Sequence, residues 1–375
     1  MLRLKKSMLE TVPLEEEIKE FLFEQGALKV GFANAESMVG GPPSTDITYK
    51  LPEAKTAICF AISQNQDFIR PYLKKELPNG RVDYEKNHID TNIRAYRISQ
   101  RVADFLKEKG YISKPLVPNN KYRKDVPGWR AHQYPELSFR YVAVRSGVAT
   151  FGWSGNVGLK GYGTTIILGC LVTTAELQPT EPLPPEEEFC TKCKLCQKSC
   201  AFRMFSHDEE TSITLGGHTF TYGKRIDFNR CNMVCGGFTG LDKEKKWSTW
   251  SPGRYDYPDD PAEAKRLFSL AFNSSMRRPI SKQDISTGFR QTALNGTIRL
   301  TCGNCQIVCW GDPTETKENY RLLTNSGCVV QKENGDTVVL PAEEAEQLFE
   351  SMSPKHKRAY YKDYKRPKKA NKSIK

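Results

Sequence analysis

The chain has 375 residues, of which 38% are hydrophobic, so it is long and apolar enough for two globular domains or for one large domain with an inserted module. Its net charge of +12 is unevenly distributed, because residues 354–375 hold ten Lys or Arg and one acid and alone contribute +9. The rest of the chain carries only about +3, which argues against a basic surface covering the whole molecule.

No apolar run reaches the length of a membrane span, and the N-terminal residues contain neither a Sec nor a twin-arginine signal. We therefore expect a cytoplasmic protein with no membrane partner. Twelve cysteines would suit a disulfide scaffold in a small secreted domain, but most of them fall here into two tight groups. Metal ligation is the better interpretation of these groups.

Helices and strands alternate over the first 178 residues. Residues 13–25 have the apolar spacing of a short helix, 28–33 and 56–63 of buried strands, 90–109 of a longer helix, and 164–174 of the strongest strand. This order predicts an α+β fold with a layered α/β domain over residues 1–178. The proline-rich, acidic residues 179–188 indicate a linker, and residues 190–310 show little periodicity, as expected where metal ligation holds the fold.

The first cysteine group has the spacing C-x2-C-x2-C-x3-C, and it consists of Cys190, Cys193, Cys196 and Cys200. This is the bacterial ferredoxin spacing, in which three thiolates hold one 4Fe-4S cluster and the fourth reaches a second cluster. Two-residue loops bring three sulfurs to three corners of a cube, and the three-residue step turns the fourth sulfur away. The motif therefore predicts a second cluster elsewhere in the chain.

The second group has the spacing C-x2-C-x3-C, in Cys302, Cys305 and Cys309. Seven of eight ligands are then assigned, and either Cys231 or Cys235 supplies the eighth, with Cys231 preferred. One cluster would take Cys190, Cys193, Cys196 and Cys309, and the other Cys200, Cys231, Cys302 and Cys305.

Zinc binding is an alternative role for the two cysteine groups. Zinc ribbons also contain pairs of CxxC motifs, but they need neither the third cysteine at x2 nor the fourth at x3. Cys59 and Cys170 lie inside apolar strand patterns and are interpreted as packed thiols, whereas Cys328 is uninformative.

Residues 136–183 lie directly before the first cysteine motif and carry a glycine-rich pattern. They resemble the corresponding segment of the epoxyqueuosine reductase and reductive dehalogenase superfamily, with three extra residues at 148–150. The matching positions are Ala143, Gly147, Phe151, Gly152, Trp153, Gly155, Asn156, Tyr162, Gly163 and Gly169.

The resemblance implies a nitroreductase-like α/β cofactor domain (1–178), then a bacterial ferredoxin-like two-cluster domain (179–325) and a C-terminal extension with a basic tail (326–375). It also implies a cobalamin bound in the base-off mode. The absence of a D-x-H-x-x-G motif around any histidine fits this mode. Glycine lets backbone approach a flat macrocycle closely, and the residues expected to contact the corrinoid are Gly147, Gly152, Trp153, Gly155, Asn156, Tyr162 and Gly163.

The catalytic position is less clear. Epoxyqueuosine reductases carry an aspartate proton donor where this chain has Asn119, which cannot donate a proton as a carboxylic acid does. Nearby Tyr122 is the alternative proton donor. Only 66 residues follow Cys309, too few for the helical extension that helps some family members to hold tRNA, so tRNA is a partner that the sequence does not favour.

These observations predict an oxidoreductase in which two 4Fe-4S clusters pass low-potential electrons from an external donor, such as a ferredoxin or flavodoxin, to a corrinoid. The substrate would be a small organic molecule or a nucleoside. An alternative is an electron-transfer or activating protein that reduces a corrinoid or metal centre on a partner and has no substrate of its own.

Overall fold

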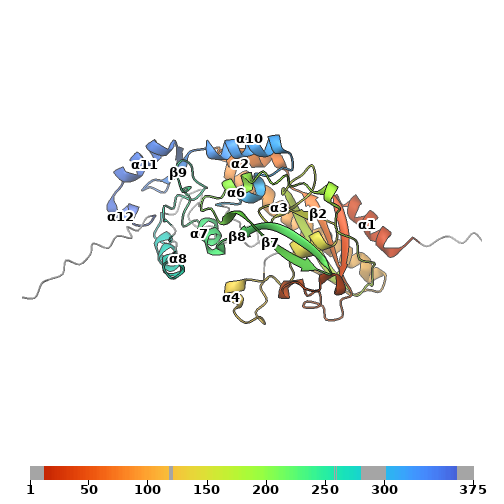
Figure 1. The fold of residues 1–375 in the computed structure, drawn as a ribbon. Helices are drawn as coiled ribbons and strands as arrows, with labels where there is room; N and C mark the ends of the chain where they lie inside the picture. The colour runs from red at the N-terminus through yellow and green to blue at the C-terminus, as the bar shows by residue number, and fades with distance from the viewer. Residues whose placement is uncertain (1–11, 118–120, 257, 259, 280–300, 361–375) are drawn as a thin grey trace, which may run out of the picture.

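A four-stranded antiparallel sheet with strand order β1-β2-β6-β3 forms the centre of the N-terminal part (Figure 1). The strands are β1 (Lys29–Asn34), β2 (Thr56–Ser63), β6 (Ile166–Thr173) and β3 (Ser113–Pro115). The computed structural model describes residues 12–117, 121–256, 258, 260–279 and 301–360. The predicted strand at 56–63 is observed with its predicted bounds, and those at 28–33 and 164–174 are observed with shifts of one or two residues.

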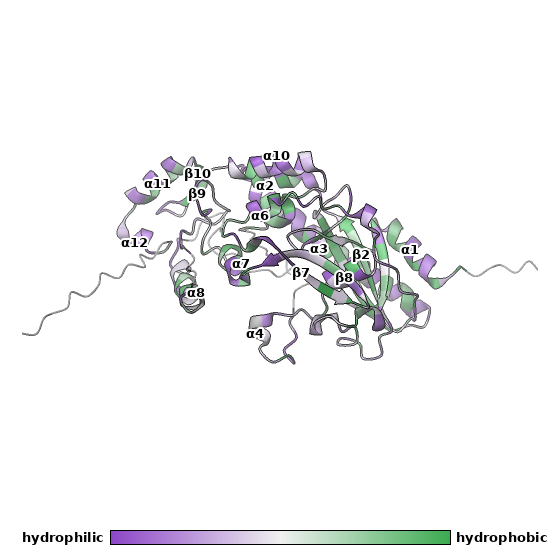
Figure 2. Cartoon of the chain, viewed as in Figure 1, coloured by the Kyte–Doolittle hydropathy of each residue, from purple (hydrophilic) through white to green (hydrophobic). Residues whose placement is uncertain are grey.

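Two helices, α1 (Leu14–Glu24) and α3 (Gly80–Glu108), cover one face of this sheet. Apolar side chains at helical spacing point from both helices to the alternating large residues of the strands. The core formed in this way includes Ile18, Leu22, Phe32, Ile58, Phe60, Ala95, Ile98, Val102, Leu106 and Leu171. The apolar sheet between helices with polar outer faces is visible in Figure 2.

The opposite face of the sheet carries smaller side chains and packs against helix α5 (Phe139–Arg145). Cys59 and Cys170 face each other across β2 and β6, and both are fully buried. They are packed thiols, as their strand positions predict. Small residues on this face let α5 approach closely, and α5 leads directly into the glycine-rich segment that adjoins the cysteines.

Helix α3 begins ten residues earlier than the sequence pattern indicates. The prediction placed its start at about Asp90, because the apolar residues at helical spacing run from Ala95 to Leu106. Its first turns instead pack against the cysteine region, where Tyr84 is 2% exposed. Tertiary packing therefore extends a helix whose first turns have weak local propensity.

Residues 179–188, predicted as a linker, run along the edge of the sheet. The Thr180 backbone N–H donates to the Phe32 carbonyl at 3.0 Å, and the Phe32 N–H donates to Thr180 Oγ1 at 3.0 Å. Lys29 pairs with Glu187 at 3.0 Å near the short 3-10 turn Pro185–Glu187. Whether a domain boundary lies near 180 stays a prediction.

A β-hairpin of strands β7 (Phe205–Leu215) and β8 (His218–Arg225) is inserted between the first cysteine motif and Cys231. Figure 1 shows it reaching from the cysteine region across to the sheet. At its tip Leu215 is fully buried in the sheet core, and Gly216 N–H donates to the Val39 carbonyl at 2.9 Å. The hairpin was missed from the sequence, although alternating residues around a Gly-Gly pair are a strong hairpin signal.

Short elements build the remainder of the chain. They are the α-helices α2 (Ile69–Leu73), α4 (Trp129–His132), α6 (Leu195–Lys198), α7 (Phe228–Cys235), α8 (Pro261–Ser275), α9 (Asn304–Ile307), α10 (Pro313–Thr324), α11 (Ala342–Ser351) and α12 (Pro354–Lys357), and the strands β4 (Thr150–Phe151), β5 (Val157–Gly158), β9 (Cys328–Gln331) and β10 (Thr337–Leu340). Helices α2, α6, α9 and α10 surround the cysteine motifs, whereas β9, β10 and α11 form a separate small core. Within the described ranges, no helix combines the length and apolar character needed to cross a bilayer.

Candidate iron-sulfur centre

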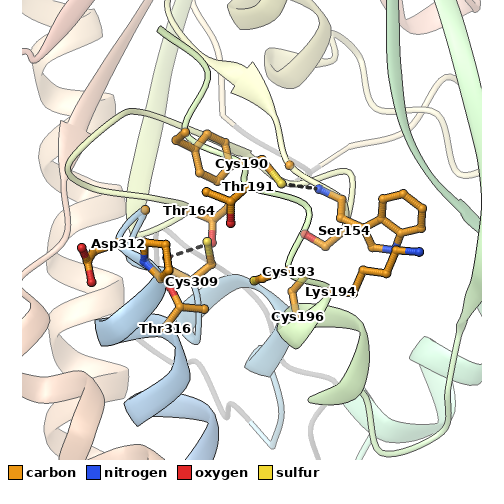
Figure 3. Close-up of a pocket in the computed structure, with 15 residues that line it drawn as sticks. Ser154, Thr164, Cys190, Thr191, Cys193, Lys194, Cys196, Cys309, Asp312 and Thr316 are labelled. Atoms are coloured by element: carbon orange, nitrogen blue, oxygen red, sulfur yellow. Dashed lines mark hydrogen bonds between the residues drawn. The ribbon is translucent and has the colours of Figure 1, made fainter. Parts of the chain in front are cut away.

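Four cysteines from distant parts of the chain line one pocket of about 430 Å³. They are Cys190, Cys193, Cys196 and Cys309, the four that the spacing assigns to the first cluster. Figure 3 shows their side chains around a common space, with Ser154 and Lys194 on one side and Thr164 and Thr316 on the other. The fold therefore places Cys309, the last cysteine of the second motif, beside the first motif, as a ferredoxin-type exchange of ligands requires.

Backbone conformation and hydrogen bonds hold this first group in place. Lys192 and Lys194 both have left-handed backbone, with φ of 54° and 59°, so the chain turns between successive cysteines. The Trp153 backbone N–H donates to Cys190 Sγ at 3.3 Å, and the Thr164 N–H donates to the Cys309 carbonyl at 3.0 Å. Cys193 is exposed, so the first group lies at the protein surface.

The second group of cysteines lies deeper. Cys200, Cys231, Cys302 and Cys305 are electrostatic neighbours of one another. The Met204 N–H donates to Cys200 Sγ at 3.3 Å, and the Asn156 side-chain amide donates to Cys305 Sγ at 3.6 Å.

A fifth cysteine, Cys235, also belongs to this second group. Its Sγ lies 3.5 Å from Cys231 Sγ, one turn away on α7, and it hydrogen-bonds Cys302. The sulfur of Cys231 is among those that raise the pKa of the Cys200 and Cys305 thiols. The choice of Cys231 over Cys235 as the eighth ligand stays a prediction, and Cys235 lies beside Cys231 and Cys302.

Burial makes two thiols of the second group, those of Cys305 and Cys200, hard to ionise without a positive partner. Burial raises the pKa of Cys305 and of Cys200 to about 12, and the neighbouring sulfurs act in the same direction. Metal ligation requires thiolates, so iron would supply the missing positive charge. Among the described residues, no three Cys, His, Asp or Glu side chains converge on a point suited to a single ion, whereas a cubane takes its four sulfurs at separate corners.

Three cations adjoin the second group. Arg140 and Arg225 are electrostatic neighbours of Cys305 and Cys231. Lys75, which is 3% exposed, neighbours Cys302 and Cys328. Burial lowers the pKa of Lys75 to about 7, and these two sulfurs act in the opposite direction. The site therefore offers positive charge on more than one side to a bound anionic group.

The glycines predicted to face a corrinoid face protein atoms instead. A Cβ added at Gly147 would lie 2.3 Å from the Glu181 carbonyl oxygen, and one at Gly152 would lie 2.8 Å from the Phe189 ring. At Gly155 it would meet the Tyr222 ring at 3.0 Å. The spaces that these glycines leave are already filled by the linker, the first motif and the hairpin.

Gly163 packs directly against the backbone at Cys309. Its φ is +57°, and an added Cβ would lie 2.3 Å from both the Cys309 carbonyl oxygen and the Gly311 nitrogen. The turn before β6 thus packs directly against the backbone of the second motif. Glycine is required here by the approach of two backbones.

The other three residues predicted to bind the corrinoid have different surroundings. Trp153 is 4% exposed, with the Lys194 ammonium 4.3 Å from its ring centre. Trp153 and Asn156 donate to cluster-motif sulfurs, as described above. Tyr162 is 36% exposed on the turn between β5 and β6. Hence the glycine-rich segment supports the cysteine motifs in this structure.

A second pocket of about 760 Å³ adjoins the first and shares Gly152, Trp153 and Cys190 with it. Strand β8 forms one wall with residues 219–222, and Glu188, Lys192 and Glu210 add charged groups. Sequence reasoning missed this pocket because one of its walls is the unrecognised hairpin.

Neither predicted catalytic residue lies in these pockets as described. Asn119 falls outside the described residues. Tyr122 is half-buried in the segment before α4, where it forms a β-bridge with Pro135, and it lines neither pocket. Neighbouring Arg123 pairs with Asp125 at 2.7 Å. A catalytic role for Tyr122 or Asn119 stays a prediction from the resemblance alone.

The structure is similar to solved structures of epoxyqueuosine reductases and reductive dehalogenases. An epoxyqueuosine reductase with a modified tRNA-Tyr stem loop is 18% identical, with a TM-score of 0.40, over 64% of this chain and 61% of that chain. The Bacillus subtilis enzyme is 18% identical, with a TM-score of 0.38, over 62% and 59%. A catabolic reductive dehalogenase is 16% identical, with a TM-score of 0.44, over 68% and 34%.

This chain therefore spans less than two thirds of the length of each of these three proteins. No family model matches the sequence. No curated protein matches it either. At this distance the similarity assigns no role to any residue of this chain.

Proposed function

We propose that the protein is an iron-sulfur oxidoreductase that binds two 4Fe-4S clusters and transfers low-potential electrons. One observation carries the proposal: Cys190, Cys193, Cys196 and Cys309 come from two distant motifs and line one pocket. When bound, such clusters supply one-electron transfer over a wide range of potentials. The residues present fit two clusters, because two sets of four cysteines adjoin each other.

The protein's own groups would orient the ligands and set their electrostatic surroundings. N–H groups of Trp153, Met204 and Asn156 donate to ligand sulfurs, and such bonds stabilise the negative charge on sulfur. Trp247 and Trp250 are buried beside the second motif and exclude water from it. The two sites thus differ in their exposure to solvent.

Exposed Cys193 marks the side on which an external donor, such as a ferredoxin or flavodoxin, would approach. The electron acceptor would be a small molecule in the 760 Å³ pocket, because this pocket shares Cys190 and Trp153 with the first site. Its charged groups would favour a polar ligand, of the small organic or nucleoside class. The acceptor would then be separated from the first cluster by little more than a ligand side chain.

A corrinoid does not fit the residues predicted to hold it. Their glycine spaces are filled by Glu181, Phe189 and Tyr222, and the hairpin forms a wall of the pocket. Binding of so large a macrocycle would require the hairpin to move. We therefore assign no step to cobalamin.

This misfit favours a second function, which is electron transfer to a corrinoid or metal centre on a partner protein without a bound substrate. The two functions predict different cofactor content and different ligands. Under the second function the pocket beside Cys190 would stay free of any small acceptor, and the exposed edge near Cys193 would contact the partner.

The deciding experiment is metal and sulfide analysis, with visible and electron paramagnetic resonance spectra, on protein purified without oxygen and incubated with hydroxocobalamin. About eight irons per chain would support the proposal, and zinc without iron would overturn it. Retained cobalt would show that the hairpin moves when a corrinoid binds. Eight irons with no cobalt, and with reduction of added small acceptors only through a partner protein, would support the second function.

A further inference from the structure

Lys75 is the only lysine that is buried in the described part of the chain, at 3% exposure. No carboxylate of the described residues pairs with it. Its ammonium donates to Ser326 Oγ and lies near the sulfurs of Cys302 and Cys328. A buried ammonium is costly unless negative charge lies nearby. The nearby arginine Arg81 has such a partner, because it is 3% exposed and pairs with Glu85 at 2.8 Å.

The backbone around Lys75 shows that the side chain is held in place. Lys75 has a φ of +55° at the C-terminal end of α2. Its N–H donates to the Tyr72 carbonyl at 3.1 Å, and the Glu76 N–H donates to the Pro71 carbonyl at 3.0 Å. This is a Schellman ending, in which glycine is the usual residue at the left-handed position. Lysine at this position directs an ammonium toward the second cysteine group at the expense of backbone strain.

Three aromatic side chains are buried at and beside α2, the helix that Lys75 follows. The Tyr72 and Trp250 rings are tilted against each other by 42° with their centres 5.7 Å apart, and the Tyr84 ring centre lies 4.5 Å from that of Tyr72. All three rings are almost fully buried, and the Tyr72 hydroxyl donates to the Cys302 carbonyl at 3.2 Å. A charge acts more strongly in such a water-excluded environment than at the surface.

Of the two neighbouring sulfurs, only that of Cys302 belongs to a cluster motif. Burial raises the pKa of Cys328 to about 11, so this thiol is neutral near pH 7. Arg140 and Arg225 act on Cys231 and Cys305, a different set of sulfurs. The negative charge that remains for Lys75 is that of the Cys302 thiolate and the group it binds.

We infer that Lys75 is a positioning residue of the second cluster, whose ammonium stabilises the reduced form of that cluster and raises its reduction potential. The inference rests on the proposed two-cluster function. Reduction adds one electron, supplied in the test by dithionite, to a group that is already anionic. A fixed cation beside Cys302 therefore favours the reduced form, and the effect is confined to the second cluster.

The test compares Lys75→Met and Lys75→Arg with Lys74→Met, all reconstituted without oxygen. Lys74 is the matched control, because it is the adjacent lysine, 45% exposed, and paired with Glu76 at 3.2 Å. Iron and sulfide are measured first, and a redox titration followed by electron paramagnetic resonance then gives two potentials. A Cys196→Ser variant, altered only at the first site, identifies which potential belongs to which cluster.

We expect Lys75→Met to keep both clusters and to lower the second potential by about 59 mV or more, which is about tenfold in the reduction equilibrium. Lys75→Arg should restore most of this change, and Lys74→Met should have no effect. Unchanged potentials in Lys75→Met, or equal shifts of both, would overturn the inference.

The iron content of the two Lys75 variants is a second test of the inference. If Lys75→Met loses half of its iron while Lys75→Arg keeps all of it, the positive charge is needed for the second cluster to bind, which supports the inference. If both variants lose the same iron, shape rather than charge matters, and the inference is wrong. Absence of iron in the unaltered protein would instead contradict the proposed function.

Discussion

The Sγ atoms of Cys231 and Cys235 lie 3.5 Å apart on successive turns of α7. Cys231 neighbours Cys200 and Cys305, whereas the sulfurs near Cys235 are those of Cys231 and Cys302. The second site therefore holds five cysteines where four are needed.

This arrangement predicts different outcomes for two single substitutions. Cys235→Ser should keep about eight irons, because it removes a bystander. Cys231→Ser should keep most of its iron with an altered resonance spectrum, since Cys235 can take over as the ligand. Only the double variant should fall to about four irons. Iron loss in Cys235→Ser alone would show that Cys235 is the native ligand.

A second prediction concerns the turn that contacts the second motif. Gly163→Ala would place a Cβ 2.3 Å from the Cys309 carbonyl oxygen, so we expect a loss of about 3 kcal/mol or more in unfolding free energy, with loss of iron. Gly161→Ala is the matched control, because Gly161 also has positive φ, +82°, but nothing lies within 4 Å of the added Cβ. It should cost only about 1 kcal/mol of backbone strain. Equal effects in denaturant titrations would refute close packing at Gly163.

His88 predicts a pH dependence of stability. Burial lowers the pKa of His88 from 6.5 to about 4, and Gln64 Nε2 donates to its Nδ1 at 2.9 Å, which requires a neutral ring. Because the folded pKa is lower than the unfolded one, the unfolded state binds the proton first. Stability is complete above pH 6.5 and falls between pH 6.5 and about 4, by at most about 3 kcal/mol from this residue.

The corresponding measurement is urea denaturation at pH 6.5 and at pH 4.5 for the unaltered protein and His88→Gln. The variant should lose less stability over this interval, because it has no imidazole to protonate. Other groups titrate equally in both proteins, so the difference between them isolates His88. Identical losses would show that His88 is accessible to protons in the folded state.

The two strand cysteines provide a negative prediction. Cys59 and Cys170 are fully buried opposite each other in the sheet. Cys59→Ala and Cys170→Ala should each keep about eight irons, and each should cost about 1 kcal/mol for the small cavity. Iron analysis and thermal unfolding check these two expectations. A loss of iron would mean that these thiols deliver or hold the metal.

Local patterns predicted much of the sheet domain. Strand β2 has the predicted bounds, and α1, β1 and β6 lie within two residues of theirs, because periodic apolar residues directly report a buried face. The start of α3 and the hairpin were missed. Contacts with residues distant in the sequence, rather than local propensity, stabilise the start of α3, whereas the hairpin carries a local signal in its Gly-Gly turn.

The sequence by itself determined which cysteines are candidate cluster ligands, because the spacing that suits a cubane is local and needs no knowledge of the remaining fold. Only the tertiary structure brought Cys309 beside Cys190, gathered Cys231 and Cys235 with Cys200, Cys302 and Cys305, and buried Lys75 near Cys302. It also filled the spaces beside the glycines at 147, 152 and 155 with protein atoms. These relations depend on packing between segments far apart in the chain, which local spacing does not encode.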